Sequence, residues 1–426
     1  MSDEHYLKAI TELGDTRNIV ASCDIFSQNG TKLIAAGIQI TSKLYDRLVN
    51  HNLLQPLDKS LSMDNALNSE HILADVLELL EGSAGLKKAA YTVSQPDSYQ
   101  QIIKNIQLPA PLTFKLTVAK EKFPRIYQHN LLLMVVSIYI AHCDGMNLQE
   151  KEGVAIAALF HDIGLLHIDP KLLVPTHIMS TIERRHLYAH PVLAYMLLDE
   201  FPELPNFVSN AILEHHERMD GNGYPRGIAG SKISRYGQIL AVGELVAKAF
   251  DPDGHRIPWK TMDVIFKLNF RKFGEGLIDY LSIFFDDDAD FQNNDREFDD
   301  VVEQVKLVSK LCFDFNNLPD TQSSGPIYDF AKSRLMGLRL SLFSAGIDPR
   351  DPEGSIQIFV DHPESIADFA AILDEAIWQF KSLLLDISRQ WPEEIDNPKS
   401  ELVKPQYTWI DQMKLVLFVA DNTSAV

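Results

Sequence analysis

The region from about residue 112 to residue 281 combines an almost wholly helical pattern with most of the chain's histidines. Nine of the 14 histidines in this 426-residue chain lie between His129 and His216. An even spread would place only about 3 histidines in a window of that length. Metal binding is the commonest reason to concentrate neutral imidazoles, and carboxylates usually complete such sites. The sequence therefore predicts a helical domain built around a metal site.

Composition shifts and turn signals divide the chain into three regions and predict a mainly α fold. We expect a small α/β module at residues 1–110, the metal-binding helical domain at residues 111–300 and a helical segment at residues 326–426. In the first region, residues 33–40 predict a strand pair about Gly37. A helical pattern with a Thr41 or Ser42 cap follows and extends to Asn50. Thr321–Pro326 is typical of a linker.

Two local signals mark helix ends in the central region. Ser180-Thr181-Ile182-Glu183 is a capping box, which predicts a helix starting after Ser180. Gly164 lies just past an apolar helical pattern that ends at His161-Asp162, and a glycine there is typical of a helix C-cap.

The composition excludes several classes of protein. A formal net charge of −20 argues against binding to a nucleic-acid polymer or to an anionic membrane, because both require basic surface. The three cysteines are far apart in the sequence and form neither a disulfide framework nor a cysteine zinc finger. The chain opens with a polar, acidic stretch, and the apolar run Leu131–Ala141 is too short to span a bilayer. We therefore expect a soluble cytoplasmic protein.

Each candidate ligand has a structural alternative when it is considered singly. His161-Asp162 ends an apolar helix, where both side chains can turn toward one pocket, but such pairs also occur by chance. His129 lies among apolar residues and could be a core histidine, and His190 could simply begin or kink a helix at Pro191.

The stretch HHERMDGNGYP, residues 215–225, favours the functional interpretation. His215 and His216 come at the end of an amphipathic helix, where surface histidines are also tolerated. However, Gly221 and Gly223 follow at once and allow backbone to approach a ligand closely. Pro225 stiffens the turn, and Tyr224 offers a ring and a hydroxyl. A simple helix end needs none of these features.

This stretch resembles the HHExxDGxGYP signature of HD-GYP domains, which are metallophosphodiesterases acting on cyclic di-GMP. The other parts of the family pattern occur in order before it, namely His129, His161-Asp162-Ile163-Gly164 and His190-Pro191. The resemblance covers roughly residues 112–285 and implies an HD-type helical core. The metal ligands that it implies are His129, His161, Asp162, His190, His215, His216 and Glu244. Glu244 takes the place of the family's aspartate.

The same resemblance implies a two-metal mechanism and a cyclic dinucleotide partner. His161 and Asp162 would be catalytic, and a hydroxide bridging two divalent transition-metal ions would attack phosphorus. Iron or manganese is favoured, and zinc is compatible. The residues implied to face the substrate are Gly221, Gly223, Tyr224, Pro225 and Arg256. A homodimer or a signalling-protein partner is compatible with this interpretation.

Three departures from the family pattern affect the substrate side. Leu165 stands where family members carry a lysine that assists at the phosphate. Arg125 replaces the glutamate that binds a third metal, so we expect two ions. Arg256 is only a weak match to the family's downstream basic residues. A lysine at position 165 would, on this argument, restore a cation at the phosphate and raise turnover.

Three interpretations remain open at the level of sequence. The first is an active cyclic di-GMP phosphodiesterase, because the metals supply most of the charge stabilisation. The second is a degenerate relative that binds metal and cyclic dinucleotide as a receptor or scaffold, which Leu165 would favour. The third is a metal-dependent phosphohydrolase of another nucleotide.

Overall fold

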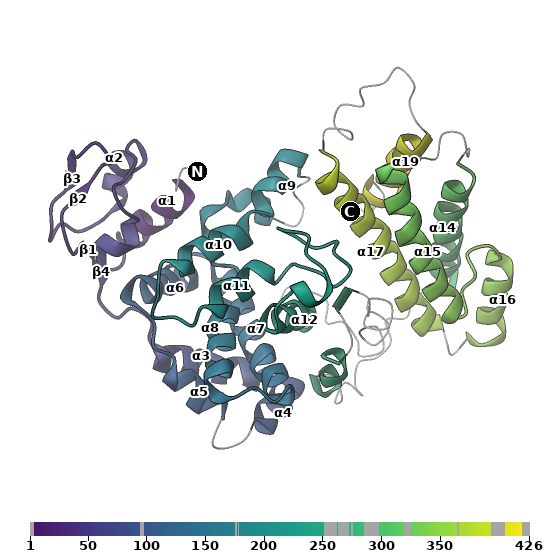
Figure 1. The fold of residues 1–426 in the computed structure, drawn as a ribbon, viewed down its shortest axis with the longest axis horizontal. Helices are drawn as coiled ribbons and strands as arrows, with labels where there is room; N and C mark the ends of the chain where they lie inside the picture. Colours follow the sequence, from purple (N-terminus) through teal and green to yellow (C-terminus); the bar gives the residue numbers. More distant parts are fainter. Residues whose placement is uncertain are drawn as a thin grey trace. The chain divides into compact units, whose positions relative to one another are not determined.

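The structure is a computed structural model of the 426-residue chain. The residues that it describes are 4–93, 98–174, 177, 179–250, 262, 272–273, 276–284, 298–318, 325–363, 366–392 and 405–419. The fold is mainly helical, as the sequence predicted, and its strands lie before residue 64 in the described part (Figure 1). The chain divides into two compact units, the first containing α1 to α12 and η6 and the second containing α14 to α19.

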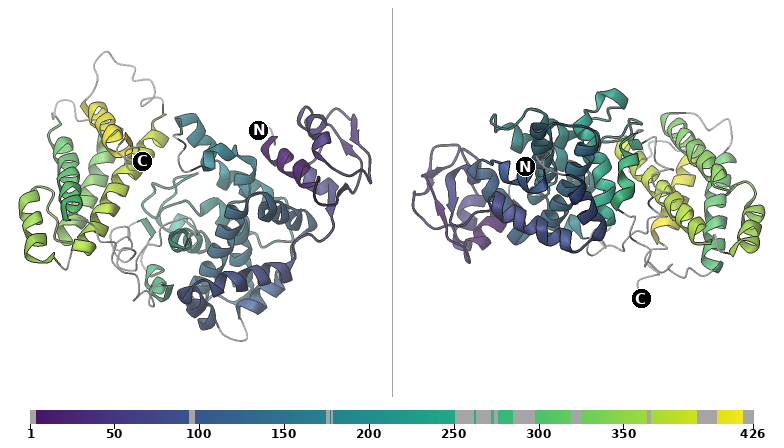
Figure 2. Two further views of the ribbon diagram at one scale, coloured as in Figure 1. Left: turned by 180° about the vertical axis from the view of Figure 1, so that it is seen from behind. Right: turned by 90° about the horizontal axis from the view of Figure 1, so that it is seen from below.

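The N-terminal elements of the first unit are short. They are α1 (Glu4–Leu13), β1 (Ile19–Ala21), β2 (Ile25–Phe26), β3 (Lys32–Ile34), η1 (Ser42–Leu44), α2 (Tyr45–Val49), η2 (Leu57–Ser60) and β4 (Leu61–Met63). β1 pairs with β4 and β2 with β3, both antiparallel. Within the first unit, this purple segment lies to one side of the longer helices in all three views (Figures 1 and 2).

Two expectations for this region need correction. Residues 33–40 do not form a strand pair about Gly37, because β3 pairs with β2 and the chain turns at Gly37, where φ is +80°. The helical pattern from Thr41 to Asn50 is divided into η1 and α2, and Thr41 makes no side-chain capping hydrogen bond. The tertiary pairing of β2 and β3 decides this arrangement, and local spacing does not reveal it.

The remaining helices of the first unit build one core. They are α3 (Ser69–Glu81), α4 (Ala84–Thr92), α5 (Tyr99–Asn105), α6 (Ala110–Lys122), α7 (Pro124–Cys143), α8 (Leu148–Phe160), η3 (Ile163–His167), η4 (Pro170–Leu173), α9 (Thr181–Leu187), α10 (His190–Asp199), α11 (Phe207–Glu214), η5 (Gly230–Lys232), α12 (Arg235–Ala249) and η6 (Ile278–Phe284). α7 is apolar around most of its circumference and packs against α8 and α12. A helix of that kind lies in the middle of a core.

α7 is also long and apolar enough to cross a membrane, and no other helix among the described residues meets that test. However, 72% of its most apolar window is buried inside the structure. This burial is typical of the central helix of a soluble protein, and a soluble chain is consistent with it.

The two predicted helix-end signals have different outcomes. The capping box at Ser180 is confirmed, because its side chain accepts from the Glu183 backbone and Glu183 bonds back to the Ser180 backbone. The C-cap role of Gly164 is wrong, because α8 ends at Phe160 and Gly164 lies inside η3 without a positive φ. A Cβ at Gly164 would lie 2.3 Å from the His190 carbonyl oxygen. This glycine therefore permits close packing of η3 against α10.

The second unit is a separate helical core. It consists of α14 (Phe298–Asn316), α15 (Pro326–Ser344), α16 (Pro352–Asp361), α17 (Ile366–Gln390) and α19 (Pro405–Val419). The helical segment expected at residues 326–426 contains α17, a single amphipathic helix of 25 residues. Its buried face packs with α14, α15 and α19, and the Trp409 indole donates to the Leu311 carbonyl at 3.1 Å. Most of the predicted linker lies outside the described residues.

Candidate metal centre

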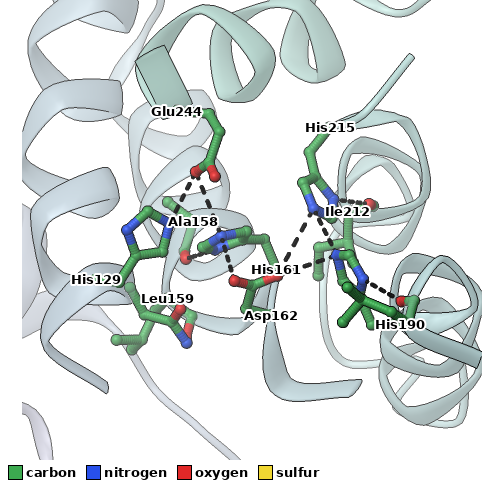
Figure 3. A network of polar contacts seen from close by, with 11 residues as sticks. His129, Ala158, Leu159, His161, Asp162, His190, Ile212, His215 and Glu244 are labelled. Carbon is green, nitrogen blue, oxygen red and sulfur yellow. Dashed lines mark hydrogen bonds and ion pairs between the residues drawn. The ribbon is translucent and has the colours of Figure 1, made fainter. Parts of the chain in front are cut away.

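The seven side chains predicted as metal ligands lie close together in the first unit, and Figure 3 shows all of them except His216. They form two clusters, within each of which the potential ligand atoms lie within 4.8 Å of one another. The four-residue cluster contains Asp162, His190, His215 and His216. The three-residue cluster contains His129, His161 and Glu244. These residues come from α7, α10 and α12 and from the positions just after α8 and α11.

Asp162 connects the two clusters. Its Oδ2 atom lies 3.4 Å from His161 Nε2, on the side of the three-residue cluster. Its Oδ1 atom lies 3.1 Å from His190 Nε2 and 3.8 Å from His215 Nε2, on the other side. One carboxylate thus presents a different oxygen to each cluster, which is the arrangement that a bridging ligand between two ions requires.

Glu244 completes the three-residue cluster from α12. Its Oε2 atom lies 2.9 Å from His129 Nε2 and 3.7 Å from His161 Nε2. The additional methylene of glutamate, compared with the aspartate expected by resemblance, is therefore accommodated. The His161 Nε2 atom faces carboxylates on two sides, from Asp162 and from Glu244 (Figure 3).

Three of the imidazoles are oriented by the turn of helix that precedes them. The Nδ1 atom of each donates to the backbone carbonyl three residues earlier, in the pairs His161–Ala158 at 2.8 Å, His190–Leu187 at 2.8 Å and His215–Ile212 at 2.5 Å. A histidine that donates from Nδ1 keeps an unprotonated Nε2 for a metal. The three Nε2 atoms all point into the space around Asp162 (Figure 3).

The electrostatics of the site also suit cations. Burial disfavours a charged His161, but Asp162 and Glu244 outweigh that effect and raise the pKa of His161 to about 8. Burial and the neighbouring His161 and His190 lower the pKa of His215 to about 3. Burial opposes the charge on Asp162 too, yet His161 and His190 hold its pKa well below the usual value. The buried His161 Nε2 makes no hydrogen bond within the described part of the chain. A metal ion would satisfy that atom and both carboxylates, so these residues fit a pair of divalent ions.

Comparison with known proteins agrees with this geometry. Residues 115–252 match the sequence family described as an HD domain. This part of the chain is an HD domain. The two His, Asp and Glu clusters are consistent with the binuclear metal site typical of HD domains.

The HD domain has distant relatives among cyclic dinucleotide phosphodiesterases. The chain is 28% identical over 144 residues to a 3'3'-cGAMP-specific phosphodiesterase of Vibrio cholerae, covering 34% of this chain and 32% of that protein. It is 29% identical to a cyclic di-GMP phosphodiesterase response regulator of Xanthomonas campestris, covering 28% and 32%. It is 32% identical to a cyclic di-GMP phosphodiesterase of Thermotoga maritima, covering 25% and 28%.

The chain thus spans about a third of the length of the curated relatives that it matches. Among solved structures, an HDG"Y"P protein from Bdellovibrio bacteriovorus aligns with a TM-score of 0.34 at 14% identity, covering 62% of this chain and 92% of that one.

The glycine-rich turn of the HD domain lies against the metal-site histidines. Tyr224 stacks on His216 with ring centroids 4.6 Å apart and contacts Tyr188 at the same separation. Gly221 adopts a φ of +77°, and a Cβ at Gly223 would lie 2.4 Å from the Arg218 nitrogen, so neither position accommodates a larger residue readily. Pro225 follows Tyr224 through a cis peptide bond. Arg256 lies outside the described residues.

Two acidic residues of the HD domain were missed as supports of this turn. Glu217 is buried and accepts from the backbone nitrogens of Arg226 at 2.7 Å and Ile228 at 3.1 Å. Glu214, also buried, accepts from the Arg226 guanidinium at 2.5 Å and from the Ser234 nitrogen at 2.8 Å. Burial raises the pKa of Glu217. Acidic residues flanking a histidine pair were the available signal, but their partners come from later in the chain.

Leu165 and Arg125, two of the departures from the family pattern, lie in different surroundings. Leu165 is 8% exposed and packs in an apolar cluster with Ile126, Ile168 and Leu172. Arg125 is exposed on α7, four residues before His129 and therefore on the same face of that helix. Leu165 is thus part of the packing beside the metal site, where the resemblance implied a residue in contact with phosphate.

Proposed function

We propose that this protein is a metal-dependent phosphodiesterase that hydrolyses a cyclic dinucleotide, with cyclic di-GMP as the first candidate. The observation that carries the proposal is the position of Asp162, whose two carboxylate oxygens face two separate clusters of histidine and carboxylate ligands. The relatives of the HD domain, which include cyclic di-GMP and cGAMP phosphodiesterases, support the substrate class.

When bound, two divalent metal ions would activate a water molecule and neutralise negative charge on a phosphodiester. The residues of the chain have distinct tasks around them. Asp162 would hold both ions, one through each carboxylate oxygen, and His161 and Glu244 would complete one side of the site. Backbone carbonyls hold His161, His190 and His215 in the orientation that ligation requires, so little rearrangement is needed when the ions bind.

The turn from Gly221 to Pro225 supplies the mouth of the site. Its glycines let backbone approach a ligand closely, and the Tyr224 ring packs against His216 and Tyr188. We propose that this aromatic group contacts a nucleobase of the substrate, since base–aromatic stacking is worth about 1–3 kcal/mol. We propose a cytoplasmic enzyme that holds iron or manganese and acts on a cyclic dinucleotide.

A receptor function is the second candidate, and Leu165 is the observation that favours it. A leucine buried in an apolar cluster cannot donate a hydrogen bond to a phosphate. A protein with complete metal ligation and a weakened phosphate contact would bind its ligand and hydrolyse it slowly or not at all. Metal binding alone therefore does not separate the two candidates, but turnover does.

The test combines metal analysis with turnover. Protein purified with and without oxygen, in the absence of chelator, is expected to hold about two equivalents of iron or manganese. It is then assayed with cyclic di-GMP and with 3'3'-cGAMP. The His161→Ala/Asp162→Ala double variant is expected to lose metal and turnover, whereas the exposed His186→Ala variant should keep both. If the metal-loaded wild type binds a cyclic dinucleotide without hydrolysing it, the receptor function replaces the enzyme.

A further inference from the structure

A buried polar cluster joins the N-terminal elements to the HD domain, and we call it the Lys115 cluster. Lys115 on α6 places its Nζ atom 2.5 Å from Asp58 Oδ2 on η2, and the two side chains are only 4% and 5% exposed. The same Nζ atom lies 4.0 Å from the centroid of the Tyr6 ring on α1. It also lies 3.5 Å from Nε2 of His167, whose ring packs on Tyr6 at 4.6 Å.

The Lys115 cluster lies one short helix away from the metal site. His167 is the last residue of η3, and Asp162 is the residue that caps the start of η3. A 3₁₀-helix of five residues rises about 10 Å, at about 2 Å per residue, so only this short element separates the Lys115 cluster from Asp162. The cavity beside the cluster has a volume of about 160 Å³ and is lined in part by Leu193 and Leu197 of α10. α10 begins with His190.

Stability alone does not account for a buried ion pair at this position. Moving a lysine and a carboxylate out of water is costly, and apolar residues of similar volume often serve a core equally well or better. The pair is also incompletely satisfied, because the buried Asp58 Oδ1 atom makes no hydrogen bond within the described residues. What the pair provides is a fixed geometry, since a short charged contact allows only one register between η2, α6 and η3.

We propose that Asp58, Lys115 and His167 are positioning residues for the reaction proposed above. They hold η3 in place, and through η3 they set the position of the Asp162 carboxylate between the two clusters. This inference rests on the proposed two-metal function. The N-terminal elements would then influence the metal site, because a change in α1 or η2 would shift Asp162 and with it the spacing of the two ions.

The test reads the metal site directly in the full chain. Lys115→Met alone leaves Asp58 buried without its partner and can prevent folding. The informative variant is therefore the double change Asp58→Leu/Lys115→Met, which removes both charges and keeps the volume. His167→Phe is the second variant, since it keeps a ring against Tyr6 and removes the contact with Lys115. The readouts are titration with Mn²⁺ and the electron paramagnetic resonance signal of the spin-coupled ion pair.

The ion pair between Lys120 and Asp75, whose side chains are 39% and 20% exposed, gives a control on the same helix. Lys120 lies five residues further along α6 and binds Asp75 on α3 at 2.7 Å, away from η3. We expect Asp75→Leu/Lys120→Met to keep the wild-type Mn²⁺ affinity and spin coupling. The Asp58→Leu/Lys115→Met and His167→Phe variants are expected to bind the second Mn²⁺ equivalent at least tenfold more weakly and to change the coupling.

The possible failures can be distinguished. Wild-type Mn²⁺ affinity and coupling in both cluster variants would overturn the positioning role and leave a purely structural ion pair. If the double variant does not fold, His167→Phe decides by the same criteria. A wild type that binds two coupled ions but hydrolyses no cyclic dinucleotide overturns the proposed activity and leaves the positioning role to be decided by the variants. A wild type without a coupled ion pair overturns both.

Discussion

Replacing Leu165 by lysine tests whether residue 165 lies in an apolar cluster, as in the structure, or contacts the phosphate, as the family pattern implies. Leu165 is 8% exposed, in contact with an apolar cluster. Losing a buried leucine side chain removes about 1.5–3 kcal/mol of hydrophobic stabilisation. A lysine kept in that cluster at pH 7 must be neutral, and lowering its pKa from about 10.4 to about 7 costs about 4.6 kcal/mol at 1.36 kcal/mol per unit.

Part of this cost is recovered if the long side chain carries its ammonium group toward water. We therefore expect Leu165→Lys to lose about 3–5 kcal/mol of unfolding free energy, a large share of the 5–15 kcal/mol typical of a domain. Because its pKa would be depressed in the folded state, the unfolded state binds more protons. The loss should then shrink as the pH rises from about 7 toward 10. Leu165→Met, which conserves volume, should cost less than about 1.5 kcal/mol.

The assay is urea denaturation of the metal-loaded wild type, Leu165→Lys and Leu165→Met at several pH values, with cyclic di-GMP turnover measured on the same samples. A destabilised Leu165→Lys protein without a gain in turnover is the expected result. A Leu165→Lys protein that is as stable as the wild type and turns over substrate faster would refute the argument. The lysine would then reach the phosphate, as the sequence pattern alone predicts.

Three further outcomes are expected. Gly164→Ala places a Cβ 2.3 Å from the His190 carbonyl oxygen, so it should lower the free energy of unfolding by about 1–3 kcal/mol and weaken Mn²⁺ binding. Gly82→Ala is the control, because its Cβ would have its nearest atom at 3.4 Å, and it should not affect Mn²⁺ binding. Calorimetric melting and metal titration check both variants. Glu217→Gln replaces a carboxylate oxygen that accepts from a backbone nitrogen with an amide donor. This change should lower the free energy of unfolding by about 1–3 kcal/mol and raise KM more than it lowers kcat. An unchanged KM would mean that the turn does not contribute to substrate binding. Arg125→Glu adds a carboxylate one helical turn before His129, and elemental analysis should find the metal content rising from about two equivalents to about three.

The sequence predicted the helical core and the residues that meet at the candidate site. The helical core followed from local spacing, whereas the set of candidate ligands came from the resemblance of HHERMDGNGYP and the motifs before it to a known family. Contacts between distant parts of the chain were not predictable in this way. Gly164 was assigned to a helix end because its close contact with α10 cannot be read from neighbouring residues.

The same limit applies to the residues that support the site. The position of Glu214 beside the histidine pair did not reveal its role, because its partners lie 12 and 20 residues further along the chain. The pairing of β3 with β2 likewise replaced the strand pair that the local pattern predicted about Gly37. Lys115 and Asp58 are 57 positions apart in the sequence, and only the fold brings their charges together.

The hydrogen bonds that orient His161, His190 and His215 each end on a carbonyl three residues earlier in the same segment. An imidazole aimed by its own backbone needs no side chain elsewhere in the chain to remain in place. We therefore expect substitutions at positions around the site, such as Leu165 and Arg125, to leave the orientation of these three rings unchanged. Successive substitutions around such a centre could change its substrate, or abolish catalysis while ligand binding remains. Metal binding would be kept throughout.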